Sequence, residues 1–188
     1  DLEDLRLTFG LEQVNLCSVS YGTRPAQAAM RDFPEGIRSV ILDSTVPIQV
    51  NQYEEAIPNA QKSFDKLFDA VAADPQANTA YPNLRAVFYE VFERLIKNPL
   101  IIPAKHPNTG EPICLYLKAD IFLGLLCHAF YSTQAIKRMP ERIYAAYRGE
   151  MGSLVEELLT MLDETPPPGP GWSAGMYFSV NCCDDKVC

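Results

Sequence analysis

The stretch that decides the fold reads Val14-Asn15-Leu16-Cys17-Ser18-Val19-Ser20-Tyr21-Gly22. Its first part, up to Val19, is a short and mostly apolar run, which is typical of a strand buried in a parallel sheet. Gly22 then opens an alanine-rich segment that favours a tightly packed helix ending at Pro34-Glu35-Gly36. The stretch therefore predicts a strand and a helix joined by a sharp turn, with Ser20 in that turn.

A second apolar strand is predicted from Ile37 to Leu42, where it is closed by Asp43-Ser44. Strand, helix and strand within about thirty residues form a βαβ unit. Such a unit implies a parallel sheet covered by helices on both faces. Upstream, Asp1 to Gly10 has the pattern of a helix stopped by glycine. The fold class predicted for this part of the chain is α/β.

Ser20 stands where a nucleophile elbow would place a reactive serine, between a strand and the first turn of a helix. The positions two before and two after it must be small, and Ser18 and Gly22 meet that need. The backbone N–H of Tyr21 would then donate to an oxyanion, near the positive end of the helix dipole. The alternative is an ordinary strand-to-helix turn in which Ser20 only caps the helix.

After Pro47 the sequence changes to helical patterns and loops. Apolar residues recur with helical spacing, for example at Phe64, Leu67, Phe68 and Val71. Asn108-Thr109-Gly110 marks a turn that could close a small hairpin.

Thr165 to Gly171 is a stiff proline-rich linker, and Met176 to Val180 is predicted as a strand that returns to the sheet. We expect a sheet-forming core segment over 1–49, a mostly helical insert over 50–164, and a linker with a return strand over 165–188.

Composition bounds the functions that are open to the chain. Its 188 residues hold 16 Lys and Arg against 24 Asp and Glu, for a net charge of −8, which argues against nucleic acid as the partner. The most apolar stretch, Ile121 to Phe130, is too short to cross a bilayer and predicts a buried helix.

The six cysteines lack zinc-site spacing, so we expect neither a metal nor a cofactor. The sequence fits either a disulfide among the last three cysteines or six free thiols, so it does not indicate the redox compartment of the protein.

The segments Asn15 to Arg24 and Met30 to Asp43 closely resemble the α/β-hydrolase family, and within it the serine hydrolases like proline iminopeptidase and tripeptidyl aminopeptidase. The resemblance extends over nearly the whole chain and implies hydrolase core strands interrupted by a helical cap over 50–164. It implies that Ser20 is the nucleophile, that Tyr21 is an oxyanion donor, and that N-terminal residues or short peptides are released from peptides; a carboxylesterase that acts on small esters is the alternative.

The same resemblance places the family's histidine and acid in core strands after the return strand. We therefore expect a fragment with little turnover of its own, completed by the missing remainder of the hydrolase domain, on the same or a separate chain. A hydrolase-like binding module without catalysis is the alternative. Ser18 departs from the family, which commonly has glycine there, and Val71 and Ala77 stand near positions where many relatives have cysteines.

Two histidines and three carboxylates complete the candidate residues. His128 is expected to be packed in a core helix and His106 to lie in a solvated loop, so neither is predicted as the base. Asp43 follows a strand end and could orient a histidine, although a structural role is the expected one. Asp184 and Asp185 could receive the α-amino group of a substrate, because an ammonium group needs a carboxylate partner; a solvated acidic turn is the alternative.

Overall fold

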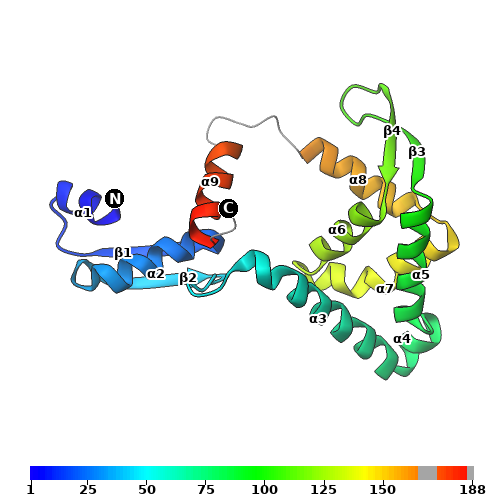
Figure 1. The fold of residues 1–188 in the computed structure, drawn as a ribbon, viewed down its shortest axis with the longest axis horizontal. Coiled ribbons are helices and arrows are strands. Elements are labelled where there is room, and N and C mark those ends of the chain that lie inside the picture. Colours follow the sequence, from blue (N-terminus) through cyan, green and yellow to red (C-terminus); the bar gives the residue numbers. More distant parts are fainter. Residues whose placement is uncertain (165–172, 186–188) are drawn as a thin grey trace. The chain divides into compact units, whose positions relative to one another are not determined.

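The structure, a computed structural model, describes residues 1–164 and 173–185, without the side chains of residues 153, 161–164, 174 and 185 (Figure 1). The chain divides into two compact units, Asp1–Pro58 with Ala174–Cys188 and Asn59–Ser173. The predicted linker, Thr165 to Gly171, lies outside the described residues. Among the described helices, none combines the length with the apolar character that a membrane span requires.

The first unit is built around a βαβ unit, as predicted, with two parallel strands side by side and one helix along them (Figure 1). The register pairs Val19 with Asp43 at the carboxyl ends of the strands. In chain order its elements are α1 (Leu2–Thr8), β1 (Val14–Val19), a 3₁₀ turn η1 (Ser20–Gly22), α2 (Thr23–Asp32), a second turn η2 (Pro34–Gly36) and β2 (Ile37–Asp43).

The prediction that helices cover both faces of the sheet is wrong for the described residues. Burial alternates along β1, where Leu16 is half-buried while its neighbours on the other face are exposed. Val19 is 59% exposed on β1 and Ile41 is 64% exposed on β2. α2 packs against both strands, and residues of α1 line a small hollow with the same half-buried side chains, Val14, Leu16 and Ile37. One face of the sheet therefore presents apolar side chains that the described part of the chain leaves uncovered.

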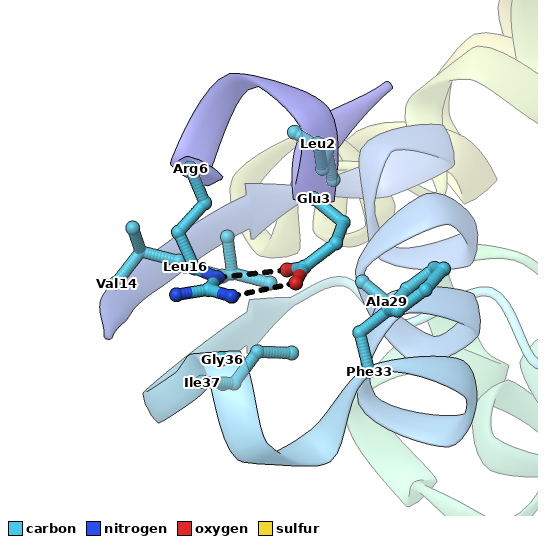
Figure 2. Close-up of a pocket in the computed structure, with 9 residues that line it drawn as sticks. All are labelled: Leu2, Glu3, Arg6, Val14, Leu16, Ala29, Phe33, Gly36 and Ile37. Atoms are coloured by element: carbon cyan, nitrogen blue, oxygen red, sulfur yellow. Dashed lines mark hydrogen bonds and ion pairs between the residues drawn. The ribbon is translucent and has the colours of Figure 1, made fainter. Parts of the chain in front are cut away.

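α1 carries an ion pair between two of its own residues, Glu3 and Arg6, which packs against Gly36, as Figure 2 shows. Arg6 Nε and Nη2 donate to the Glu3 carboxylate at 2.8 and 2.6 Å. A Cβ added to Gly36 would lie 2.6 Å from Arg6 Nε and 2.9 Å from Glu3 Oε2. A residue with a side chain therefore cannot replace Gly36 unless the pair moves. A hollow of only ≈ 20 Å³ remains among these residues and the apolar side chains around them.

The second unit is mostly helical and has its own apolar core. α5, α6 and α7 contact one another, and the strands β3 and β4 form the predicted antiparallel hairpin. In this core the ring of Phe64 is tilted against that of Phe88 and meets that of Phe130 edge to face. In chain order the elements are α3 (Gln52–Ala73, which begins in the first unit), α4 (Pro75–Ala80), α5 (Leu84–Lys97), β3 (Leu100–Lys105), β4 (Pro112–Leu117), α6 (Ala119–Ala129), α7 (Thr133–Arg148) and α8 (Gly152–Glu164).

The predicted return strand over Met176 to Val180 is wrong, because these residues belong to a helix, α9 (Ala174–Asp185). A short apolar run fits a strand and a helical segment equally well, so periodicity does not separate the two. Within the helix, Asn181 Nδ2 donates to the carbonyl of Tyr177 one turn earlier at 2.8 Å.

The expectation that His128 is packed in a core is also wrong, although its helix is largely buried as predicted. The buried side of α6 is formed by residues spaced three and four apart, namely Phe122, Leu125, Leu126 and Ala129. His128 lies off that stripe and is exposed, with its ring 5.9 Å from the ring of Tyr131.

Candidate active site

Ser20 occupies a strained turn directly after β1. Its φ is 52°, in the left-handed region that residues with a Cβ seldom adopt. Holding a serine there costs on the order of 1–3 kcal/mol, and such strain clusters at functional sites. The side chain is exposed, and no hydrogen bond of its hydroxyl occurs in the described part of the chain. The backbone thus presents the Ser20 hydroxyl at the point where the strand turns into α2.

The close approach expected around the elbow is present. A Cβ added to Gly22 would lie 4.0 Å from the Cβ of Ser18, which is an ordinary van der Waals contact. The serine at position 18 therefore fits beside Gly22 without displacing α2.

Thr23, the first residue of α2, is fully buried under this turn. Its hydroxyl donates to the carbonyl of Ser20 at 2.7 Å and accepts from the N–H of Val46 at 2.9 Å. The strained turn is therefore joined by one side chain to the segment that follows β2.

A second left-handed serine lies at the neighbouring strand end. Ser44 has a φ of 55°, and its hydroxyl donates to Asp43 Oδ1 at 3.0 Å. Since Asp43 pairs with Val19, Ser44 follows its strand at the same edge of the sheet as Ser20. The structure thus places the Asp43 carboxylate at the edge that carries the elbow, where it is exposed.

Asp184, predicted as a substrate-binding residue, reaches the residue next to Ser20. Tyr21 Oη donates to Asp184 Oδ2 at 2.6 Å, although the two residues are 163 positions apart. Both line an open hollow of ≈ 340 Å³ together with Arg24, Pro25, Ala28 and Ile48. Asp185 ends α9, but its side chain lies outside the described residues.

A second pair of contacts fastens α9 within the same unit. Gln52 Nε2 donates to Asn181 Oδ1 at 3.0 Å, and Asn181 is 7% exposed. The hydroxyls of Tyr53 and Tyr177 lie 3.4 Å apart. The position of Asp184 beside Tyr21 is therefore supported by contacts along the helix that carries it.

Neither histidine belongs to the unit that contains Ser20. His106 and His128 both lie in the second unit. His106 Nδ1 accepts from the N–H of Asn108 at 3.2 Å, which stabilises the turn of the hairpin. Within the described ranges, no group of three or more His, Cys, Asp or Glu side chains is arranged to hold a metal ion. Cys182 is disulfide-bonded, whereas Cys183 is a free thiol.

Comparison with known proteins agrees with this geometry. The model of the alpha/beta hydrolase fold family matches residues 1–99, which include the Ser20 turn. The chain is 32% identical over 116 residues to proteins described as serine protease Hip1 from Mycobacterium bovis and Mycobacterium tuberculosis. That alignment covers 60% of this chain and 21% of each relative, so the chain spans about a fifth of their length. No solved structure matches the chain significantly.

Proposed function

Because the chain belongs to the alpha/beta hydrolase fold family, we propose that Ser20 is the nucleophile of a serine hydrolase that cleaves peptides. The observation that carries this proposal is the left-handed φ of 52° at Ser20, between β1 and α2. A strained serine in a strand-to-helix turn is how this fold exposes its nucleophile. The serine protease named among the relatives supports a peptide as the substrate.

The proposed reaction is acyl transfer to water. Ser20 Oγ attacks the substrate carbonyl carbon while a histidine base takes its proton, and the carbonyl oxygen becomes an oxyanion that accepts from the Tyr21 N–H. The base then returns the proton to the departing amine, and a water molecule hydrolyses the acyl-serine ester. The unit that contains Ser20 has no histidine among its described residues.

We therefore propose that further hydrolase-core segments complete the site, on the same or another chain. The uncovered face of the β1–β2 pair, with Val19 and Ile41 exposed, supports this. The 188 residues alone should show little turnover, because a nucleophile without its base retains only a small part of the catalysis.

The proposed substrate has a free amino terminus, from which single residues or short peptides are released. Asp184 supports this assignment, since its carboxylate lies in the hollow beside Tyr21 and could receive an ammonium group. Asp185 is proposed as a second carboxylate for the same group. A carboxylesterase that acts on small esters is the second candidate, since one fold hosts many substrates. A binding module without catalysis is the third.

A fluorophosphonate probe tests the proposal on the protein as isolated from its natural source. We expect Ser20→Ala to abolish labelling and Ser44→Ala to leave it intact. Ser44 is the matched control because it is exposed, has a similar φ and follows the neighbouring strand. An aminoacyl nitroanilide should be cleaved faster than nitrophenyl acetate. The reverse order would favour the esterase, and a natural protein that takes no label at all would favour the binding module.

A further inference from the structure

We propose that Thr23 is a positioning residue that aims the Tyr21 N–H at the oxyanion, an inference that rests on the proposed function of Ser20. Thr23 is fully buried, so its hydroxyl has no water to bond with and must satisfy itself inside the protein. It does so with two backbone partners, the carbonyl of Ser20 at 2.7 Å and the N–H of Val46 at 2.9 Å.

One peptide unit connects the Thr23 hydroxyl with the N–H proposed to bind the oxyanion. The Ser20 carbonyl and the Tyr21 N–H belong to the same peptide unit, which is planar and trans, so the two bonds point in opposite directions. A hydrogen bond that fixes the direction of the Ser20 oxygen therefore fixes the direction of the Tyr21 N–H as well. Thr23 holds this plane from inside the protein, on the side opposite to the proposed oxyanion.

The direction of the Thr23 hydroxyl is itself fixed by the segment after β2. The N–H of Val46 can only donate, so it occupies a lone pair of Thr23 Oγ1 and leaves the hydroxyl proton for the Ser20 carbonyl. Gln27, one turn along α2, donates to the carbonyls of Val46 and Thr23 at 2.8 and 3.0 Å. Residue 46 is thus held at both its N–H and its carbonyl, and Thr23 has a rigid partner behind it.

The left-handed turn benefits from this support, which adds to the backbone N–H at the end of η1 that also donates to the Ser20 carbonyl. Ser20 at a φ of 52° would relax toward common backbone regions if nothing held it, and the Ser20–Tyr21 peptide would rotate with it. An N–H that stabilises only the tetrahedral intermediate affects kcat and leaves substrate binding nearly unchanged. A positioning defect should therefore lower kcat at constant KM.

The test compares Thr23→Val, Thr23→Ser and Gln27→Leu in the natural protein. Thr23→Val removes the hydroxyl at similar shape, and we expect kcat to fall about tenfold at unchanged KM, less than the roughly 10²–10³-fold loss when an oxyanion donor is deleted. Thr23→Ser restores the hydroxyl and should restore kcat. Gln27→Leu weakens the anchoring of residue 46 without touching the Ser20 carbonyl, so it should lower kcat by less than Thr23→Val does, at unchanged KM.

Two further measurements keep the outcome decisive. Should Thr23→Val fail to fold, Thr23→Cys offers a weak S–H donor and should give an intermediate kcat. Crystal structures of the variants report the Ser20–Tyr21 peptide directly, and we expect it to rotate in Thr23→Val and not in Thr23→Ser. An unchanged peptide plane, or an equal kcat in Thr23→Val and wild type, would overturn the inference. A wild-type protein without Ser20-dependent activity would overturn the proposed function instead, and the peptide orientation would then decide the role of Thr23 alone.

Discussion

Val19, the last residue of β1, lies directly opposite Asp43, the last residue of β2, in a parallel register. Because the two strands end level with each other, Ser20 and Ser44 begin neighbouring turns, and both have a positive φ. The same local strain thus occurs twice at one edge of the sheet. Only the Ser20 turn is followed directly by a helix, α2, whose N-terminus lies behind it.

The positive φ of Ser20 and of Ser44 predicts that glycine at either position stabilises the fold, whereas only the change at Ser20 abolishes function. Glycine adopts a positive φ without strain, so Ser20→Gly and Ser44→Gly should each stabilise the fold by about 0.5–1 kcal/mol after the extra flexibility of the unfolded chain is subtracted. Urea titrations measure this. Ser20→Gly should abolish probe labelling, whereas Ser44→Gly should keep it. A loss of stability in Ser20→Gly would mean that the serine is held by contacts rather than strained.

The hydrogen bond between Tyr21 and Asp184 predicts how the amino terminus is recognised. Asp184→Asn should raise KM about tenfold for a nitroanilide with a free amino group, because a charge-assisted contact is lost. It should leave KM unchanged for the N-acetylated analogue. Tyr21→Phe keeps the backbone N–H and the charge of Asp184 while removing the bond between the two side chains, so its effect on KM should be smaller. Equal effects of Asp184→Asn on both substrates would exclude an amine contact.

Gly36 predicts a local packing requirement. Gly36→Ala places a Cβ 2.6 Å from Arg6 Nε, so the Glu3–Arg6 pair must shift, and we expect a loss of about 1–3 kcal/mol in the free energy of unfolding. Gly124→Ala is the matched control, because a Cβ there meets nothing within 4 Å and α6 gains a better helix former. The control should therefore be neutral or stabilising. A tolerated Gly36→Ala would show that α1 can move freely on the βαβ unit.

The same ion pair predicts a dependence on pH. The hydrogen bond from Arg6 lowers the pKa of Glu3 in the folded protein below the ordinary value of 4.5. The contribution of the Glu3–Arg6 pair to the free energy of unfolding is therefore complete above pH 4.5 and is lost as the pH falls through the lowered pKa of Glu3. Chemical denaturation should show Glu3→Gln to be less stable than wild type at pH 7, with the difference shrinking toward pH 3. Glu35→Gln, which changes an exposed carboxylate in η2, is the control and should give no such trend.

The local parts of the fold could be predicted from sequence, and the comparisons confirm the α/β-hydrolase assignment. The βαβ unit and the β3–β4 hairpin follow from short-range patterns, namely apolar runs and turn residues. The Met176 to Val180 run fits a strand and a helix equally well in its short-range pattern, and it is helical in the structure. Burial of His128 could not be read from the hydropathy of its helix, because only the contacts of α6 decide which side faces the core.

Part of the site could also be predicted, because it depends on short-range sequence patterns. Ser20 stands in a recognisable strand-turn-helix pattern, which also points to the Tyr21 N–H. The involvement of Thr23 depends on where one hydroxyl proton points, and nothing in the spacing of residues indicates it. Likewise, acidic residues after an apolar run indicate a solvated turn as readily as a contact, so the bond from Tyr21 to Asp184 had to be seen in three dimensions.

The separation of Tyr21 from Asp184 has a consequence for how the protein matures. During synthesis the Ser20 turn can form as soon as the βαβ unit has left the ribosome, because its contacts are local. The carboxylate that borders it is made 163 residues after Tyr21, when the whole second unit has already been translated. The hollow beside Tyr21 is therefore completed only after the second unit has been translated, and until then a nascent chain carries a turn of near-final geometry without the group proposed to receive its substrate.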